Sequence, residues 1–212
     1  MIIKNIIWDW NGTIINDAYL FVDIMNTTLK KYRLPLITLQ DYKNNFCFPI
    51  QKYWKTLGFK FNNQQFQTMN KSFIALYESK MKEPCLQKGA LRVLDFAKQR
   101  SFNQFVLSAS EHKILNKMVS FYNVDKYFYD ILGVNNLNAT GKIDLAKNLM
   151  QNHNLNPLET VVIGDTLYDK EVSCSINSHL VLVACGHFNK KRLIEKNNVV
   201  VDKLIEIIPL LS

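Results

Sequence analysis

The sequence is poor in glycine and proline and has no long apolar run. It contains 7 Gly and 5 Pro in 212 residues, which excludes collagen-like and Gly/Ser-rich classes. No apolar stretch reaches the roughly 18 residues that a membrane-spanning helix needs. The apolar start of the chain is broken at Lys4 and Asn5 and stops at Asp9, too soon for a signal peptide. We therefore expect no membrane association and a cytoplasmic location.

Paired cysteines are also missing. Cys47, Cys85, Cys174 and Cys185 form no C-x-x-C pair and no zinc-like spacing with histidine. The sequence predicts lone thiols in a reducing compartment.

Acidic residues are outnumbered, with 18 Asp and Glu against 26 Lys and Arg, a formal charge of +8. The cations are spread along the chain, and the densest groups are only Lys30–Lys31 and Lys190–Arg192. This pattern favours a solvated basic surface over a nucleic-acid footprint and remains compatible with small anionic substrates. A hydrophobic fraction of 48% supports a large core.

The order of expected elements indicates an α/β protein with a helical insertion. A buried strand is expected over 2–8, followed by four helices and no strand between 16 and 82. Asn16 or Asp17 is expected to cap the first of these helices, and Thr38 the second. From 83 onward helices and strands alternate: helices over 89–100, 110–121 and 143–151, and strands over 104–107, 128–132, 161–163, 180–184 and 199–201. Such alternation predicts a mostly parallel sheet covered on both faces.

Two finer expectations concern these helices. Leu91, Leu94 and Ala97 are expected to face the core from the helix over 89–100. Ser110 is expected to cap the helix that follows it.

Polar residues follow three of the expected strands, where parallel sheets form their sites. Asp9 ends the first strand and is followed by Asn11, Gly12 and Thr13. By itself, this segment is equally consistent with an ordinary strand-to-helix turn and with a functional site. Asp165 and Asp169 follow another strand; they suit either a helix N-terminus or a hard cation such as Mg²⁺.

Two further residues are candidates for phosphate binding. Ser108 ends a strand and opens a helix, where a hydroxyl and backbone N–H groups hold either a phosphate or a simple cap. Lys142 is not part of a P-loop and by itself suggests a surface lysine. Considered together with the other segments, Lys142 is a candidate for the positive charge that binds a phosphate.

In combination and in this order, the segments resemble the four motifs of the haloacid dehalogenase superfamily. The motifs are similar to Asp9–Ile14, Phe105–Ser108, Lys142 and Gly164–Asp169. The resemblance implies a Rossmann-like core, residues 1–15 and 83–212, and an inserted helical cap of the C1 type, residues 16–82. That cap is similar to the caps of the phosphoglycolate phosphatase and β-phosphoglucomutase branch. Phe21, Tyr19 or Tyr53 would face the substrate from the cap.

The resemblance also implies roles for individual residues. Asp9 would be the nucleophile that forms an aspartyl-phosphate, acting with Lys142 as a further catalytic residue. Mg²⁺ would be held by Asp9, the Asn11 backbone carbonyl, Asp165 and Asp169.

The phosphoryl group would be bound by Ser108, Ala109, Thr13 and Lys142, of which Ser108 and Lys142 would neutralise its developing charge. The implied protein is a Mg²⁺-dependent phosphatase for a small phosphorylated metabolite, monomeric or homodimeric.

One position departs from the family pattern. Asn11 stands where such phosphatases usually carry the Asp that protonates the leaving oxygen, and an amide cannot do this. Loss of a general acid typically costs ~10²–10⁴ in rate. Three outcomes stay open: a slow phosphatase, an enzyme for acyl or aryl phosphates, or a non-catalytic phosphate-binding protein. A phosphomutase is disfavoured. We expect Asn11→Asp to raise turnover about tenfold or more.

Overall fold

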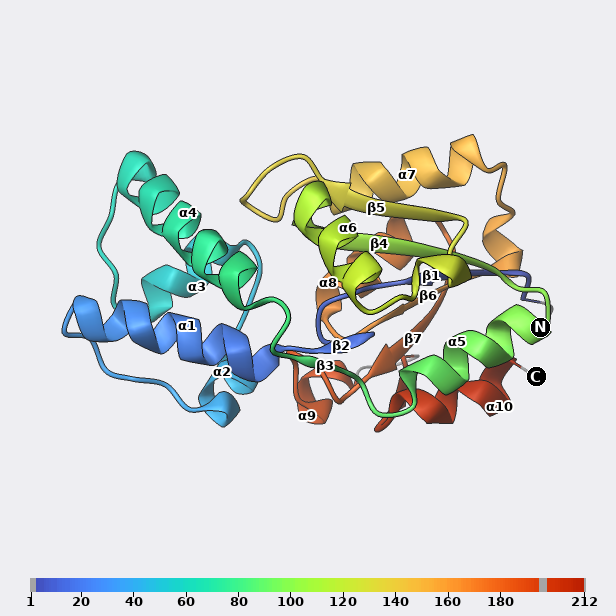
Figure 1. Cartoon of the computed structure of the whole chain (residues 1–212), viewed down its shortest axis with the longest axis horizontal. Coiled ribbons are helices and arrows are strands. Elements are labelled where there is room, and N and C mark those ends of the chain that lie inside the picture. The colour runs from blue at the N-terminus through green and yellow to red at the C-terminus, as the bar shows by residue number, and fades with distance from the viewer. Residues whose placement is uncertain (1–2, 195–197, 212) are drawn as a thin grey trace.

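The computed structural model describes residues 3–194 and 198–211, and its central feature is a parallel sheet. The strands lie in the order β5-β4-β1-β6-β7-β8, and every neighbouring pair is parallel (Figure 1). Their bounds are β1 Asn5–Trp8, β4 Asn103–Glu111, β5 Asp130–Val134, β6 Thr160–Gly164, β7 His179–Val183 and β8 Val199–Val201. The chain places β4 and β5 on one side of β1 and β6 to β8 on the other. This reversal beside β1 is where open parallel sheets bind ligands.

Helices cover both faces of the sheet, as expected. Ile7, Phe105 and Val162 are register partners on neighbouring strands and pack with α7 and α8. The alternate residues Ile6 and Trp8 belong to the core on the opposite face, with α5 and α6. The bounds are α5 Ala90–Gln99, α6 His112–Phe121, α7 Lys142–Asn152, α8 Leu167–Ser175, α9 Lys190–Leu193 and α10 Ile208–Leu211, with 3-10 turns η1 Asp125–Tyr127, η2 Pro157–Glu159 and η3 Leu204–Ile207.

A separate layer of helices stands beyond the carboxyl ends of the strands, and we call it the cap (Figure 1). It consists of α1 Ala18–Lys31, α2 Leu39–Asn45, α3 Ile50–Thr56 and α4 Asn63–Lys80. Thr38 caps α2 as expected, through reciprocal hydrogen bonds with Asp41. The α/β class with an inserted helical cap is therefore confirmed.

The sequence did not predict two short strands at the edges of the cap, and the expectation of no strand over 16–82 is wrong only at Asn16. Ile15–Asn16 forms β2 and pairs antiparallel with β3, Cys85–Leu86. These two short strands are the points where the chain enters and leaves the cap. Because β2 and β3 pair, the two segments that connect the core to the cap run side by side as a two-stranded ribbon (Figure 1).

Three other local expectations are corrected. Leu91 is 49% exposed, because the buried stripe of α5 runs through Ala90, Val93, Leu94 and Ala97 at helical spacing. Strand β4 continues past Leu107 to Glu111, so Ser110 lies in the strand and the Glu111 carboxylate caps α6 instead. Strand β5 spans Asp130–Val134 and so begins two residues later than expected.

Candidate functional site

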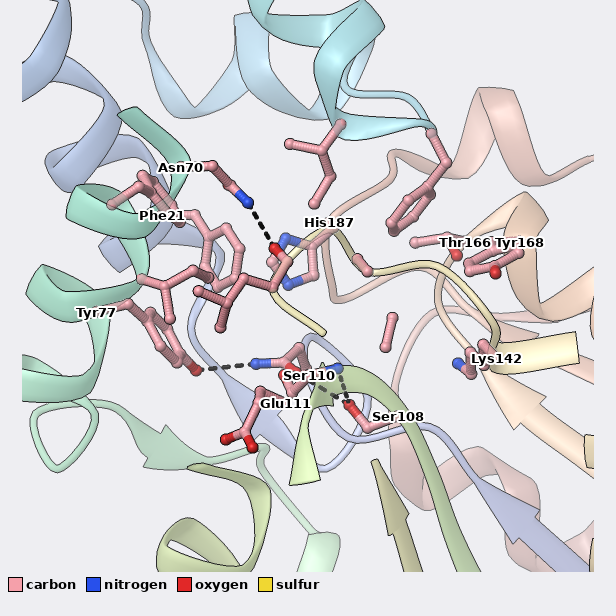
Figure 2. A pocket seen from close by; sticks show the side chains of 18 of the residues that line it. Phe21, Asn70, Tyr77, Ser108, Ser110, Glu111, Lys142, Thr166, Tyr168 and His187 are labelled. Carbon is pink, nitrogen blue, oxygen red and sulfur yellow. Dashed lines mark hydrogen bonds between the residues drawn. The ribbon is translucent and has the colours of Figure 1, made fainter. Parts of the chain in front are cut away.

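Three buried carboxylates and one buried lysine meet at the carboxyl ends of the central strands. Asp9 directly follows β1, Asp165 directly follows β6, and Asp169 lies in the first turn of α8. One oxygen of each lies within 4.8 Å of the others. The Nζ atom of Lys142 is 2.5 Å from Asp9 Oδ1 and 2.6 Å from Asp169 Oδ1. Figure 2 shows Lys142 and Ser108 on the core side of the adjoining cavity.

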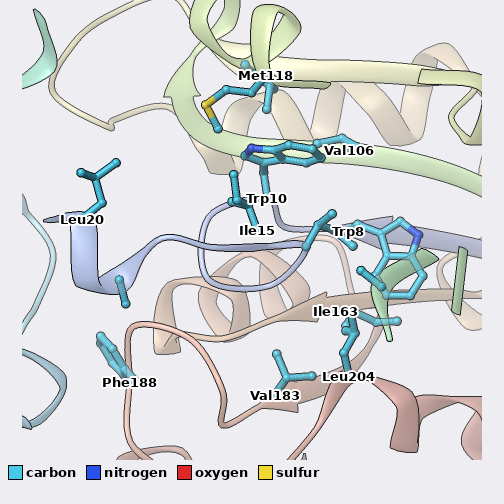
Figure 3. Packing of buried hydrophobic residues seen from close by; sticks show 14 of the residues in the cluster. Trp8, Trp10, Ile15, Leu20, Val106, Met118, Ile163, Val183, Phe188 and Leu204 are labelled. Carbon is cyan, nitrogen blue, oxygen red and sulfur yellow. The ribbon is translucent and has the colours of Figure 1, made fainter. Parts of the chain in front are cut away.

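Two tryptophans fix the position of Asp9. Trp8 and Trp10 flank it in the sequence, and both are fully buried (Figure 3). The Trp8 indole donates to Gln104 Oε1 at 3.0 Å, and Trp10 packs near the Tyr122 ring. Because both neighbours are anchored in the core, Asp9 has little freedom to leave the end of the strand.

Burial sets the electrostatics of the cluster. It raises the pKa of Asp9 well above the ordinary value, despite the opposing charge of Lys142. Burial likewise raises the pKa of Asp165 to about 6, against the lowering effect of His187. For Lys142, burial lowers the pKa, but the nearby Asp169 and Asp9 carboxylates outweigh it and the net shift is upward. Lys142 is therefore charged, whereas burial makes Asp9 and Asp165 harder to ionise than free carboxyl groups.

This donor set fits a divalent cation. Hard cations take carboxylate oxygens, and burying several carboxylates together is costly unless a cation accompanies them. All three carboxylates also accept hydrogen bonds from the protein. Lys142 donates to Asp9 and Asp169, the backbone N–H of Thr166 donates to Asp169 at 3.0 Å, and the His187 N–H donates to Asp165.

The Asn11 side chain is held by a network that the sequence did not reveal. Its Nδ2 donates to Asp17 Oδ2 at 2.6 Å and lies 2.8 Å from the Tyr77 hydroxyl. Its Oδ1 accepts from the Ser110 hydroxyl at 2.6 Å and from Ser108 at 3.4 Å. Asp17 does not cap α1 with its side chain, contrary to the expectation; it accepts from the Gly12 N–H and from Tyr77.

His187 is a second site residue that the sequence analysis missed. Its backbone N–H donates to Asp165, and its Nδ1 lies 2.8 Å from the Tyr42 hydroxyl of the cap. Its Nε2 lies 3.3 Å from Asp17 Oδ1, within ion-pair distance but without hydrogen-bond geometry. Burial lowers the His187 pKa, and Asp17 reverses this to a net rise. His187 follows β7, so the strand-end rule that identified Asp9 would also have identified it.

The cap is closed over the site from two sides. On one side, Arg192 donates to the Phe46 carbonyl at 2.7 Å and Tyr42 meets His187. On the other side, Asn70 of α4 donates to the Leu137 carbonyl at 2.5 Å (Figure 2). The cavity between cap and core has a volume of about 100 Å³. Since one water needs roughly 10–15 Å³, it has room for a small ester.

The remaining candidates take different positions. Ser108, Ala109 and Lys142 line the cavity. Thr13 is fully buried outside the lining and donates to Asp165 Oδ1 at 3.3 Å. Of the three aromatic residues considered for the cap, Phe21 lines the cavity, whereas Tyr19 and Tyr53 do not.

Gly12 lets the loop pass close to the carboxylates. Its φ is +77°, and a Cβ there would lie 2.3 Å from Asp165 Oδ2. Only glycine therefore fits this position without displacing Asp165.

Comparison with known families assigns the chain to a class. Residues 6–183 match the model of the haloacid dehalogenase-like hydrolases, and the chain belongs to this family. Comparison with curated proteins finds no match.

Solved structures share the fold over nearly the whole chain. A predicted phosphatase from Clostridium acetobutylicum is similar with a TM-score of 0.85 and 16% identity, covering 100% of this chain and 99% of the other. A haloacid dehalogenase-like hydrolase from Streptococcus pneumoniae has a TM-score of 0.82 and 18% identity, covering 99% of both chains. A predicted phosphoglycolate phosphatase from Haemophilus somnus has a TM-score of 0.81 and 17% identity, covering 99% and 98%.

Proposed function

We propose that this protein is a Mg²⁺-dependent phosphatase that hydrolyses small phosphate monoesters through an aspartyl-phosphate on Asp9. The observation that carries the proposal is the meeting of Asp9, Asp165 and Asp169 within 4.8 Å, with Lys142 at 2.5 Å from Asp9. A nucleophilic carboxylate, a cation-binding set and a fixed positive charge are what phosphoryl transfer requires.

In the proposed reaction, an Asp9 oxygen attacks phosphorus and the bond to the leaving oxygen breaks, with the electron pair departing on that oxygen. Water then attacks the aspartyl-phosphate and releases inorganic phosphate. Lys142 and the Ser108 hydroxyl would bind phosphoryl oxygens. Mg²⁺, held by Asp9, Asp165 and the Asn11 carbonyl with Asp169 beside them, would supply Lewis-acid stabilisation of the phosphoryl charge.

The proposal includes the cap boundaries at 16 and 82 and a small phosphorylated metabolite as substrate. It also includes a cytoplasmic, monomeric or homodimeric enzyme. Among the described residues, none of the helices is long and apolar enough to cross a membrane. A phosphate-binding protein without turnover is the alternative, favoured by the amide at Asn11.

The test is phosphate release from a panel of esters with and without Mg²⁺, using wild type and Asp9→Asn. We expect Mg²⁺-dependent release by wild type and none by Asp9→Asn, together with loss of the thermal stabilisation by BeF₃⁻. Asp144→Asn, an exposed acid in the first turn of α7, is the matched control and keeps wild-type activity. Full activity of Asp9→Asn would exclude the nucleophile role. BeF₃⁻ binding by wild type without turnover would support the alternative.

A further inference from the structure

The cap side of the cavity is apolar and largely aromatic. Phe21 and Met25 of α1, together with Phe73 and Ile74 of α4, line one side. The segment through α2 and α3 contributes Phe46, Phe48, Ile50 and Trp54. Figure 2 shows Phe21 and Tyr77 facing the cavity opposite Ser108 and Lys142. A group that enters from the phosphate site toward the cap therefore meets apolar surface.

Among the residues that the structure describes, no cation lines the cap side of the cavity to hold a charged leaving group. Among the described residues that line the cavity, the potential cations are Lys142 and His187, both from the core. Lys142 is committed to Asp9 and Asp169, and His187 lies between Tyr42 and Asp17. A carboxylate or a second phosphate on the leaving group would be desolvated against aromatic rings without a counter-charge.

Protonation of the leaving oxygen is also hindered. Asn11 has no transferable proton, and its amide is held by Asp17 and Tyr77. Glu111 is a further acid in the lining, but its carboxylate caps α6 by accepting from the Ile114 N–H at 3.1 Å. The Trp54 indole N–H, which is buried and has no partner among the described residues, offers a single donor to a polar atom of the substrate.

We propose that the site selects phosphates joined to a flat, uncharged ring through an oxygen that departs as a stable anion, namely aryl phosphates and aromatic acyl phosphates. This inference rests on the proposed function and adds its substrate class. The P–O bond breaks with its electron pair on the phenolate or carboxylate oxygen, which needs no proton from the enzyme. Water, the second reactant, then hydrolyses the aspartyl-phosphate to inorganic phosphate and releases one proton.

Five compounds test the effect of the ring and of the leaving group separately. Phenyl phosphate and benzoyl phosphate have both the ring and a good leaving group, benzyl phosphate has the ring but a poor leaving group, and acetyl phosphate has a good leaving group but no ring. 2-Phosphoglycolate has a charged leaving group. We expect kcat/KM for benzoyl phosphate to exceed that for acetyl phosphate at least about tenfold, after subtraction of spontaneous hydrolysis. We expect kcat for benzyl phosphate to be about 100-fold below that for phenyl phosphate.

A cation introduced into the cap should change the selectivity. Ile74→Arg places a guanidinium in the lining of the cavity and is expected to raise the kcat/KM ratio of 2-phosphoglycolate to phenyl phosphate at least about tenfold. Leu76→Arg on the same helix is the control, because Leu76 is partly buried and does not line the cavity; the ratio should stay at its wild-type value. Thermal melting confirms that both variants fold.

The outcomes distinguish this inference from the function on which it rests. Turnover of 2-phosphoglycolate or sugar phosphates as efficient as that of phenyl phosphate overturns the substrate class and leaves the phosphatase function standing. An unchanged ratio in Ile74→Arg also overturns it. No release from any compound overturns the phosphatase function and the inference with it.

Discussion

The Nδ2 atom of Asn11 donates a hydrogen bond of 2.6 Å to the fully buried carboxylate of Asp17. Because of this contact, a carboxylate at position 11 would be difficult to accommodate. Its oxygen would lie as close to the buried Asp17 carboxylate as the Asn11 Nδ2 atom does now. Two such groups share one proton or repel each other. The effect of restoring the missing acid therefore depends on Asp17.

Asn11→Asp should destabilise the protein by about 3 kcal/mol at neutral pH, because it leaves a buried charge uncompensated. The double variant Asn11→Asp/Asp17→Asn re-forms the amide–carboxylate pair with the partners exchanged. It should recover most of the stability and raise turnover of benzyl phosphate about tenfold or more over wild type. Urea unfolding and phosphate release measure both effects. Asp17→Asn alone is the control for the loss of the Asp17 carboxylate. If Asn11→Asp were as stable as wild type, the two carboxylates at positions 11 and 17 would not repel each other, which would contradict the prediction.

Tyr77→Phe removes the hydroxyl by which α4 of the cap contacts Asp17 and Asn11. The hydroxyl donates to Asp17 at 2.7 Å, and burial raises its pKa well above the ordinary value, so it is neutral at physiological pH. We expect a loss of about 1–2 kcal/mol in the free energy of unfolding. Tyr32→Phe is the control, since Tyr32 is 55% exposed. Equal stability of the two variants would show that the contact contributes nothing.

A comparison of Gly12→Ala with Gly141→Ala distinguishes the cost of backbone strain at a positive φ from the effect of displacing the Asp165 side chain. Both positions have positive φ, +77° and +93°, but only the Cβ at Gly12 would strike the Asp165 carboxylate, while the Cβ at Gly141 meets nothing within 4 Å. Each variant should lose about 1 kcal/mol through strain. Gly12→Ala should in addition lose stabilisation by Mg²⁺, as measured by thermal melting. Normal Mg²⁺ binding in Gly12→Ala would exclude Asp165 from the cation site.

Stabilisation by Mg²⁺ should increase with pH. The pKa of Asp165 is raised from 3.8 to about 6, so the folded, metal-free chain keeps a proton that the unfolded chain has already lost. Between these values, rising pH lowers the stability contributed by this group. A cation must displace the same proton, so the Mg²⁺-induced rise in Tm should be larger at about pH 7.5 than at about pH 5. Asp165→Asn should show little Mg²⁺ effect at either pH; a pH-independent shift in wild type would contradict the assignment.

The sequence predicted the core side of the site because one local rule covers it. Asp9 and Asp165 directly follow parallel strands, and strands are recognisable from their apolar runs. Ser108, expected to end its strand, lies within β4 three residues before the strand ends at Glu111. The cap side could not be predicted in the same way. Asp17 has the sequence position of a helix cap, yet its side chain contacts Asn11 and Tyr77, 6 and 60 residues away. Such contacts depend on how the cap docks, which local periodicity does not encode.

The pairing of β2 with β3 has a consequence for how this protein can diverge. The chain leaves the core at Ile15–Asn16 and returns beside the same point at Cys85–Leu86. Because the two ends of the inserted segment are adjacent, its length and helix content can change without altering the closure of the parallel sheet. New substrate preferences can therefore evolve in the inserted segment while the proposed phosphoryl-transfer site in the core is inherited unchanged.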